Sequence, residues 1–229
     1  MKKMIISLLT TILLFGLLSC KKDEVAAVSA FSSAPEAQAE HNTKSGGIYK
    51  GALIGSSGNI KITLQKGVAS ILATIDGASK TLTTTSLGSW TSGQPIKNAV
   101  FSSGDWQMTF TVGVDGSNPV ATFSIPGHPT MDSILGKESS SAVIRVFEGT
   151  YKGSETGTWN IMYQAGTLLG LNRPSNSMSG NHFVGLVDSN MITIDTFIGS
   201  GKIDVDKVSG EWQGSTPDFK GTWEGKRTL

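Results

Sequence analysis

From Gly46 to the C-terminus, apolar residues alternate with polar ones at a period of two. The clearest stretches are 59–65, 106–112, 202–206 and 219–223. Successive side chains of a β-strand point to opposite faces, so this period predicts strands with one apolar and one hydrated face. A helical bundle would need a longer period and runs of Ala, Leu, Glu and Lys, which this region lacks.

Turn-forming sequences separate these stretches at intervals of about 8–12 residues, as in antiparallel meanders. Asp76-Gly77 and Asp115-Gly116 match the type I′ hairpin, whose two central residues need positive φ. The one candidate helix spans residues 129–137, with Thr130 as N-cap and Gly136 as the stop. We therefore expect an all-β fold of about 12–14 short strands.

Two halves of this all-β domain (residues 46–229) share short stretches of similar sequence. They are 47–51 with 149–153, 62–67 with 161–166, and 116–119 with 214–217. The matches are colinear, which indicates a duplicated unit. We expect two tandem β-meanders, residues 46–128 and 146–229, joined by 129–145. They would form an antiparallel β-barrel or sandwich, and the absence of a Pro/Gly linker favours one unit over two small barrels.

The N-terminus has the organisation of a bacterial export signal. Lys2 and Lys3 precede an apolar stretch, Ile5–Leu18, which is too short to span about 30 Å of hydrocarbon. The following Leu17-Leu18-Ser19-Cys20 resembles the lipobox of bacterial lipoproteins. This resemblance implies removal of residues 1–19 and attachment of acyl chains to Cys20, which would anchor the protein in a membrane.

Residues 20–45 contain the lipidated Cys20 and are otherwise rich in small and polar residues, so they predict a flexible tether in which His41 has no role. The cluster Lys21-Lys22-Asp23-Glu24 resembles the export signal of surface lipoproteins in the Bacteroidota. It implies an outer-membrane lipoprotein exposed at the cell surface, with the periplasm-facing leaflet as the alternative.

Two further stretches, Gly157-Thr158-Trp159 and 221–227, resemble the calycin pattern of lipocalins and avidins. In such barrels a late Arg can pack its guanidinium against the ring of an early Trp. The resemblance implies contact between Trp159 and Arg227 and favours a barrel.

Charged and nucleophilic residues form no recognisable catalytic motif. The net charge of +1 argues against a nucleic-acid partner. The three His lack a zinc-ligand spacing, so we expect no metal and no cofactor. There is no Gly-x-Ser-x-Gly sequence. Glu211 and Glu224, each beside a Trp, are the carboxylates that a glycosidase would use. We expect a protein that is not an enzyme.

The tryptophans offer the remaining candidates. Trp106, Trp159 and Trp223 lie in alternating stretches and are expected in the core. Trp90 and Trp212 lie in polar, glycine-flanked stretches and are the predicted ligand-binding residues, because an exposed Trp can stack on a sugar or hold an apolar molecule.

Together these features predict a membrane-anchored lipoprotein whose β-domain binds a glycan, a small apolar molecule or an envelope protein. One alternative is an extracellular polysaccharide hydrolase. Another is a structural subunit of an outer-membrane complex, which would offer an unpaired edge strand to its neighbour.

Overall fold

The computed structural model describes residues 31–129, 131–194 and 198–229. Within these ranges the chain forms sixteen strands and one short 3₁₀ turn, Ala39–His41. It contains no helix long and apolar enough to cross a membrane there. The all-β prediction is therefore confirmed. The predicted signal peptide, Cys20 and the cluster at 21–24 lie outside the described residues.

The first half of the chain forms one antiparallel sheet in the strand order β7-β6-β5-β4-β3-β2-β1-β8. Its strands are β1 (Gly47–Ile54), β2 (Gly58–Gln65), β3 (Val68–Ile75), β4 (Ala78–Thr83), β5 (Ile96–Ser103), β6 (Trp106–Val112), β7 (Val120–Ser124) and β8 (Asp132–Glu138). The last strand returns to the first, so the sheet is nearly closed. Its two edges are β7 and β8.

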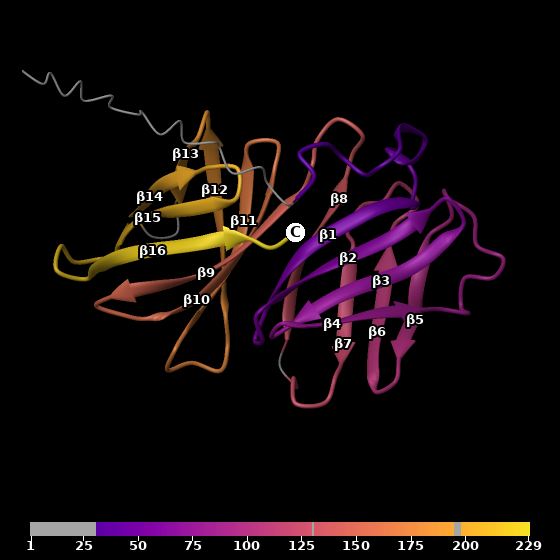
Figure 1. The fold of residues 1–229 in the computed structure, drawn as a ribbon, viewed down its shortest axis with the longest axis horizontal. Coiled ribbons are helices and arrows are strands. Elements are labelled where there is room, and N and C mark those ends of the chain that lie inside the picture. The colour runs from indigo at the N-terminus through magenta and orange to yellow at the C-terminus, as the bar shows by residue number, and fades with distance from the viewer. Residues whose placement is uncertain (1–30, 130, 195–197) are drawn as a thin grey trace, which may run out of the picture.

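The second half forms a closed barrel in which β16 pairs with β9. Its strands are β9 (Arg145–Gly153), β10 (Gly157–Gln164), β11 (Thr167–Pro174), β12 (Asn181–Asp188), β13 (Met191–Ile194), β14 (Ile198–Ile203), β15 (Lys207–Gln213) and β16 (Lys220–Arg227). Figure 1 shows this barrel in orange and yellow beside the indigo and magenta sheet of the first half.

The two halves repeat one topology, an eight-stranded meander whose first and last strands pair. The stretches 62–67 and 161–166 occupy equivalent places, since each ends a second strand and enters a tight turn. Both turns have positive φ at two successive residues, 55° and 74° at Lys66-Gly67 and 48° and 85° at Ala165-Gly166. The internal repeat is confirmed at this level.

The other two sequence matches are not structurally equivalent. Tyr49 pairs with Ile62, and Phe147 pairs with Ile161, so β1 and β9 align with Tyr49 opposite Phe147 rather than Tyr151. Residues 116–119 lie between β6 and β7, whereas 214–217 lie between β15 and β16. Frequent Gly and Ser in turns account for these coincidences.

Each half encloses its own core instead of contributing to one shared barrel. Tyr49, Phe101 and Phe110 lie in the first core, and Phe147 and Trp223 lie in the second. The expectation of a single unit is therefore wrong. The physical reason is strand number, because eight strands already make a barrel whose interior side chains can fill.

The predicted helix at 129–137 is also wrong, because most of it is β8. Seven residues of β8 pair with β1, from Asp132 opposite Ile54 to Glu138 opposite Ile48. An isolated helix of this length is marginal in water, whereas the ladder with β1 satisfies the same backbone groups. The joining segment therefore shortens to about 139–144, between β8 and β9.

Residues 36–45 were expected in the tether but are packed on the first sheet. The carboxylate of Glu138 accepts hydrogen bonds from the backbone N–H of Glu36 (2.6 Å) and Ala37 (3.2 Å). The Tyr49 hydroxyl donates to the Ser45 carbonyl (2.7 Å), and His41 is buried. A composition typical of a tether does not reveal these partners, of which Glu138 lies about a hundred residues further along the chain.

A third, small core joins the halves. It consists of Ala52, Ile144, Val146 and Met162. Polar contacts surround it: Ser57 Oγ donates to Glu148 Oε2 (2.9 Å), and the buried amide of Asn160 donates to the Leu53 carbonyl. The two halves therefore pack directly on one another.

A candidate binding cavity at one end of the closed barrel

Inside the closed barrel, five large aromatic rings each lie over a glycine directly opposite on a neighbouring strand. A Cβ built on any of these glycines would lie within 2.6 Å of the ring. Without the glycines, rings of this size could not fit inside eight strands. The pairs are Trp159 with Gly149, Trp223 with Gly210, Trp212 with Gly221, Tyr151 with Gly157, and Phe183 with Gly170.

These rings leave a cavity of about 130 Å³ at one end of the barrel. Three edge-to-face contacts form its wall: Trp212 with Tyr151 (centroids 6.1 Å apart), Trp212 with Phe219 (5.3 Å), and Trp159 with Trp223 (5.6 Å). Cavities of about 150 Å³ hold a benzene ring, so this one suits a molecule built on a single ring. The described lining residues are Tyr151, Glu155, Trp159, Ile161, Asn172, Phe183, Ile194, Trp212, Gly214, Phe219 and Trp223.

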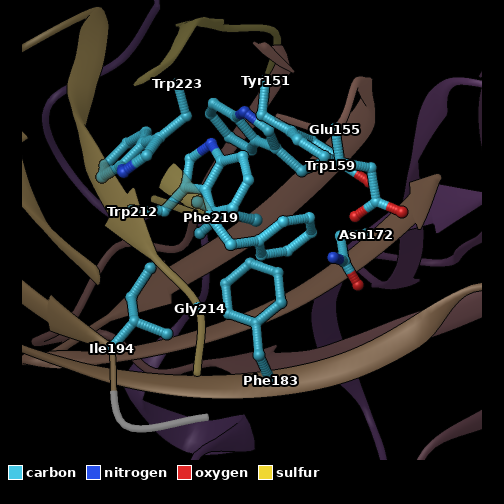
Figure 2. Close-up of a pocket in the computed structure, with 11 residues that line it drawn as sticks. Tyr151, Glu155, Trp159, Asn172, Phe183, Ile194, Trp212, Gly214, Phe219 and Trp223 are labelled. Atoms are coloured by element: carbon cyan, nitrogen blue, oxygen red, sulfur yellow. The ribbon is translucent and has the colours of Figure 1, made fainter. Parts of the chain in front are cut away.

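Polar groups gather on one side of this aromatic wall. Figure 2 shows the two polar lining residues on the same side of the rings: Glu155, from the β9–β10 connection, and Asn172, which lies on β11. Burial and the charge of Glu155 raise the pKa of Tyr151 to about 12. The Tyr151 hydroxyl therefore stays neutral at physiological pH, so it can donate a hydrogen bond.

Two buried polar atoms of the lining have no hydrogen-bond partner within the described chain, the Tyr151 hydroxyl and Trp212 Nε1. The other two tryptophans of the wall are satisfied. Trp159 Nε1 donates to the Thr150 carbonyl and Trp223 Nε1 to the Glu211 carbonyl, each at 3.1 Å. Among these four aromatic side chains, only Tyr151 and Trp212 therefore lack a partner in the described chain. Arg145 Nε on β9 and Asn160 Oδ1 on β10 also lack one, but neither residue lines the cavity.

The structure does not bring the two predicted ligand-binding residues together. Trp212 lines the cavity, but it is 8% exposed and lies in β15 instead of standing free on a loop. Trp90 belongs to the other half of the molecule. Its ring packs on the first core, and its Nε1 donates to the Gln94 carbonyl (3.0 Å).

Several lining residues were missed by sequence reasoning. Trp159 and Trp223 are in the core as expected but also face the cavity. Tyr151, Phe183 and Glu155 were not considered. The alternation of glycine with aromatic residues along paired strands was the available signal. It becomes readable only when the strand register is known.

The carboxylates suggested for a hydrolase do not meet in the cavity. Glu211 and Glu224 are exposed on β15 and β16, where Trp212 and Trp223 point inward, so alternation places both carboxylates on the outer face. Within the described residues, no group of three or more His, Cys, Asp or Glu could hold a metal ion.

The contact implied by the calycin pattern is also absent. Trp159 packs against Trp223, and the Arg227 guanidinium lies 5.2 Å from the ring centroid of Phe31. Comparison with known proteins finds no matching family model, no matching curated protein and no matching solved structure.

Proposed function

We propose that the protein binds a small, ring-sized apolar molecule in the cavity of the closed barrel. The observation that carries this proposal is a cavity of about 130 Å³ that is walled almost entirely by aromatic and aliphatic side chains. Burial of an apolar ring in such a cavity is favourable in proportion to the apolar area that it removes from water.

The cellular setting is part of the same proposal. The lipobox-like sequence ending at Cys20 supports anchoring by acyl chains, and the Lys21–Glu24 cluster supports display at the outer surface of the outer membrane. In that setting the barrel would hold its ligand at the cell envelope without transforming it.

A titration of the chain from Lys21 onward with benzyl alcohol, a neutral single-ring probe, tests the binding proposal. We expect a saturable change in Trp fluorescence and a rise in Tm, because a ligand present at 100 times its Kd adds about 2.7 kcal/mol of stability. Trp212→Phe should reduce the fluorescence change. Trp90→Phe is the matched control and should preserve it, since Trp90 lies in the other half. Equal loss in both variants, or no saturable response in the wild type, would refute the proposal.

A second candidate function is strand addition to a neighbouring protein. The edges of the first sheet, β7 and β8, are not hydrogen-bonded to one another. Unpaired edges can accept a strand from a partner. Amide hydrogen exchange tests whether the edge is open. The amides of β7 should exchange faster than those of β15, which pairs with a strand on each side. Equal protection of the two strands would remove the candidate.

A further inference from the structure

We infer that the molecule held in this cavity is a cation, an organic ammonium whose apolar part is about the size of one ring. This inference rests on the proposed binding function and adds the charge of the ligand to it. Three features of the cavity support a cation: the charge of the lining, the positions of the surrounding lysines and arginine, and the aromatic walls.

Glu155 is the only charged side chain among the described residues that line the cavity. It is half-buried, and no hydrogen bond or ion pair to it is found within the described chain. A carboxylate beside an aromatic cavity normally has a cationic or hydrogen-bonding partner when it is partly buried. Here the described part of the chain supplies no such partner.

The nearby cationic side chains face away from the cavity. Lys152 follows Tyr151, Arg173 follows Asn172 and Lys220 precedes Gly221, so strand alternation places all three on the outer face of the barrel. Arg173 is also engaged elsewhere, because its guanidinium donates to the Gly55 carbonyl in the other half. None of the three can neutralise Glu155 from inside the cavity.

The aromatic walls of the cavity favour a cation, as the Glu155 carboxylate does. Six aromatic rings of the described residues line the cavity, and the face of an aromatic ring carries the negative part of its quadrupole. Organic ammonium groups are attracted to such faces. An anion would be repelled by both Glu155 and the rings, and a neutral ring would gain from burial alone. The lining rings are those of Tyr151, Trp159, Phe183, Trp212, Phe219 and Trp223.

Three probes of the same size separate these cases: benzylammonium, benzyl alcohol and benzoate, each titrated into the chain from Lys21 onward by calorimetry at neutral pH. We expect benzylammonium to bind about three- to tenfold more tightly than benzyl alcohol, and benzoate to bind most weakly. Glu155→Gln, which keeps the shape and removes the charge, should abolish the preference for benzylammonium and leave the affinity for benzyl alcohol unchanged. Glu155→Asp should retain the preference.

Glu224→Gln is the matched control, because Glu224 is a carboxylate of the same barrel on its outer face. If it weakens benzylammonium binding as much as Glu155→Gln, the preference comes from net charge and the inference is overturned. Equal affinity for benzyl alcohol and benzylammonium in the wild type also overturns it but leaves the binding function standing. If none of the three probes binds, the proposed function itself fails.

Discussion

Replacement of Glu138 by Ala should destabilise the fold more than any change on the outer face of the barrel. The Glu138 carboxylate is fully buried, and Lys50, at 3% exposure, donates to it at 2.7 Å. It also accepts from the backbone N–H of Ile144 (2.9 Å), Glu36 (2.6 Å) and Ala37 (3.2 Å). One side chain thus joins β1, the N-terminal segment and the connection between the halves.

The expected loss of stability follows from the charged and polar groups that lose their partner when Glu138 is replaced. Removal of one member of a buried ion pair typically costs 3–5 kcal/mol, because the remaining charge is uncompensated. Lys50 retains a second partner in the half-exposed Glu36 at 2.9 Å, but three backbone donors lose their acceptor. We therefore expect a loss of about 4 kcal/mol. At about 2–4 °C per kcal/mol for a chain of this size, Tm should fall by about 8–16 °C.

Urea denaturation and calorimetry measure this loss directly. Glu211→Ala, at an exposed position, is the control and should change stability by less than about 0.5 kcal/mol. The double variant Lys50→Met/Glu138→Leu should recover only the part of the loss that comes from the Lys50 charge, because the N–H groups of Glu36, Ala37 and Ile144 still lack their acceptor. If Glu138→Ala is no more damaging than Glu211→Ala, the role assigned to this carboxylate is refuted.

Three further predictions concern the barrel and the N-terminal segment. Gly170→Ala should cost about 1–3 kcal/mol by overpacking, because its Cβ would lie 2.0 Å from Phe183 Cζ. Gly88→Ala, with no atom closer than 3.9 Å, should be nearly neutral, and equal Tm values would contradict the glycine–ring packing. Burial raises the pKa of Glu36, but hydrogen bonds to Lys50 and Lys61 outweigh burial and lower the pKa below its usual range. The stability that Glu36 contributes is therefore present above the usual glutamate pKa and is lost as the pH falls through the lowered pKa of the folded state. Glu36→Gln should make the free energy of unfolding depend less steeply on pH in acid. An unchanged dependence would contradict this. The pKa of Tyr151 is raised to about 12, so Tyr151→Phe should leave the ultraviolet absorbance of tyrosinate unchanged up to about pH 11. A lower absorbance in the variant below that pH would disprove the raised pKa of Tyr151.

Short-range patterns account for much of the agreement between sequence and structure. The alternation at 106–112 became β6, with Trp106, Met108 and Phe110 buried. Asp76-Gly77 forms a turn with φ of 47° and 82°, as a type I′ hairpin requires. At Asp115-Gly116 only Gly116 has positive φ, because the chain there forms a wider loop. The loop is closed by a hydrogen bond from the Gly113 N–H to the Ser117 carbonyl.

The sequence by itself determined that this chain is all-β, because side-chain alternation and turn residues act over a few neighbouring positions. It also indicated two related halves and an N-terminal export signal. Which strands pair, and where each sheet closes, was decided only by the tertiary structure. Alternation specifies an apolar face without naming the strand beside it, so β8 could be recognised only from its ladder with β1. The same limit applies to the candidate site: Glu155, Asn172 and Trp212 are far apart in the chain and meet only because eight strands close into a barrel.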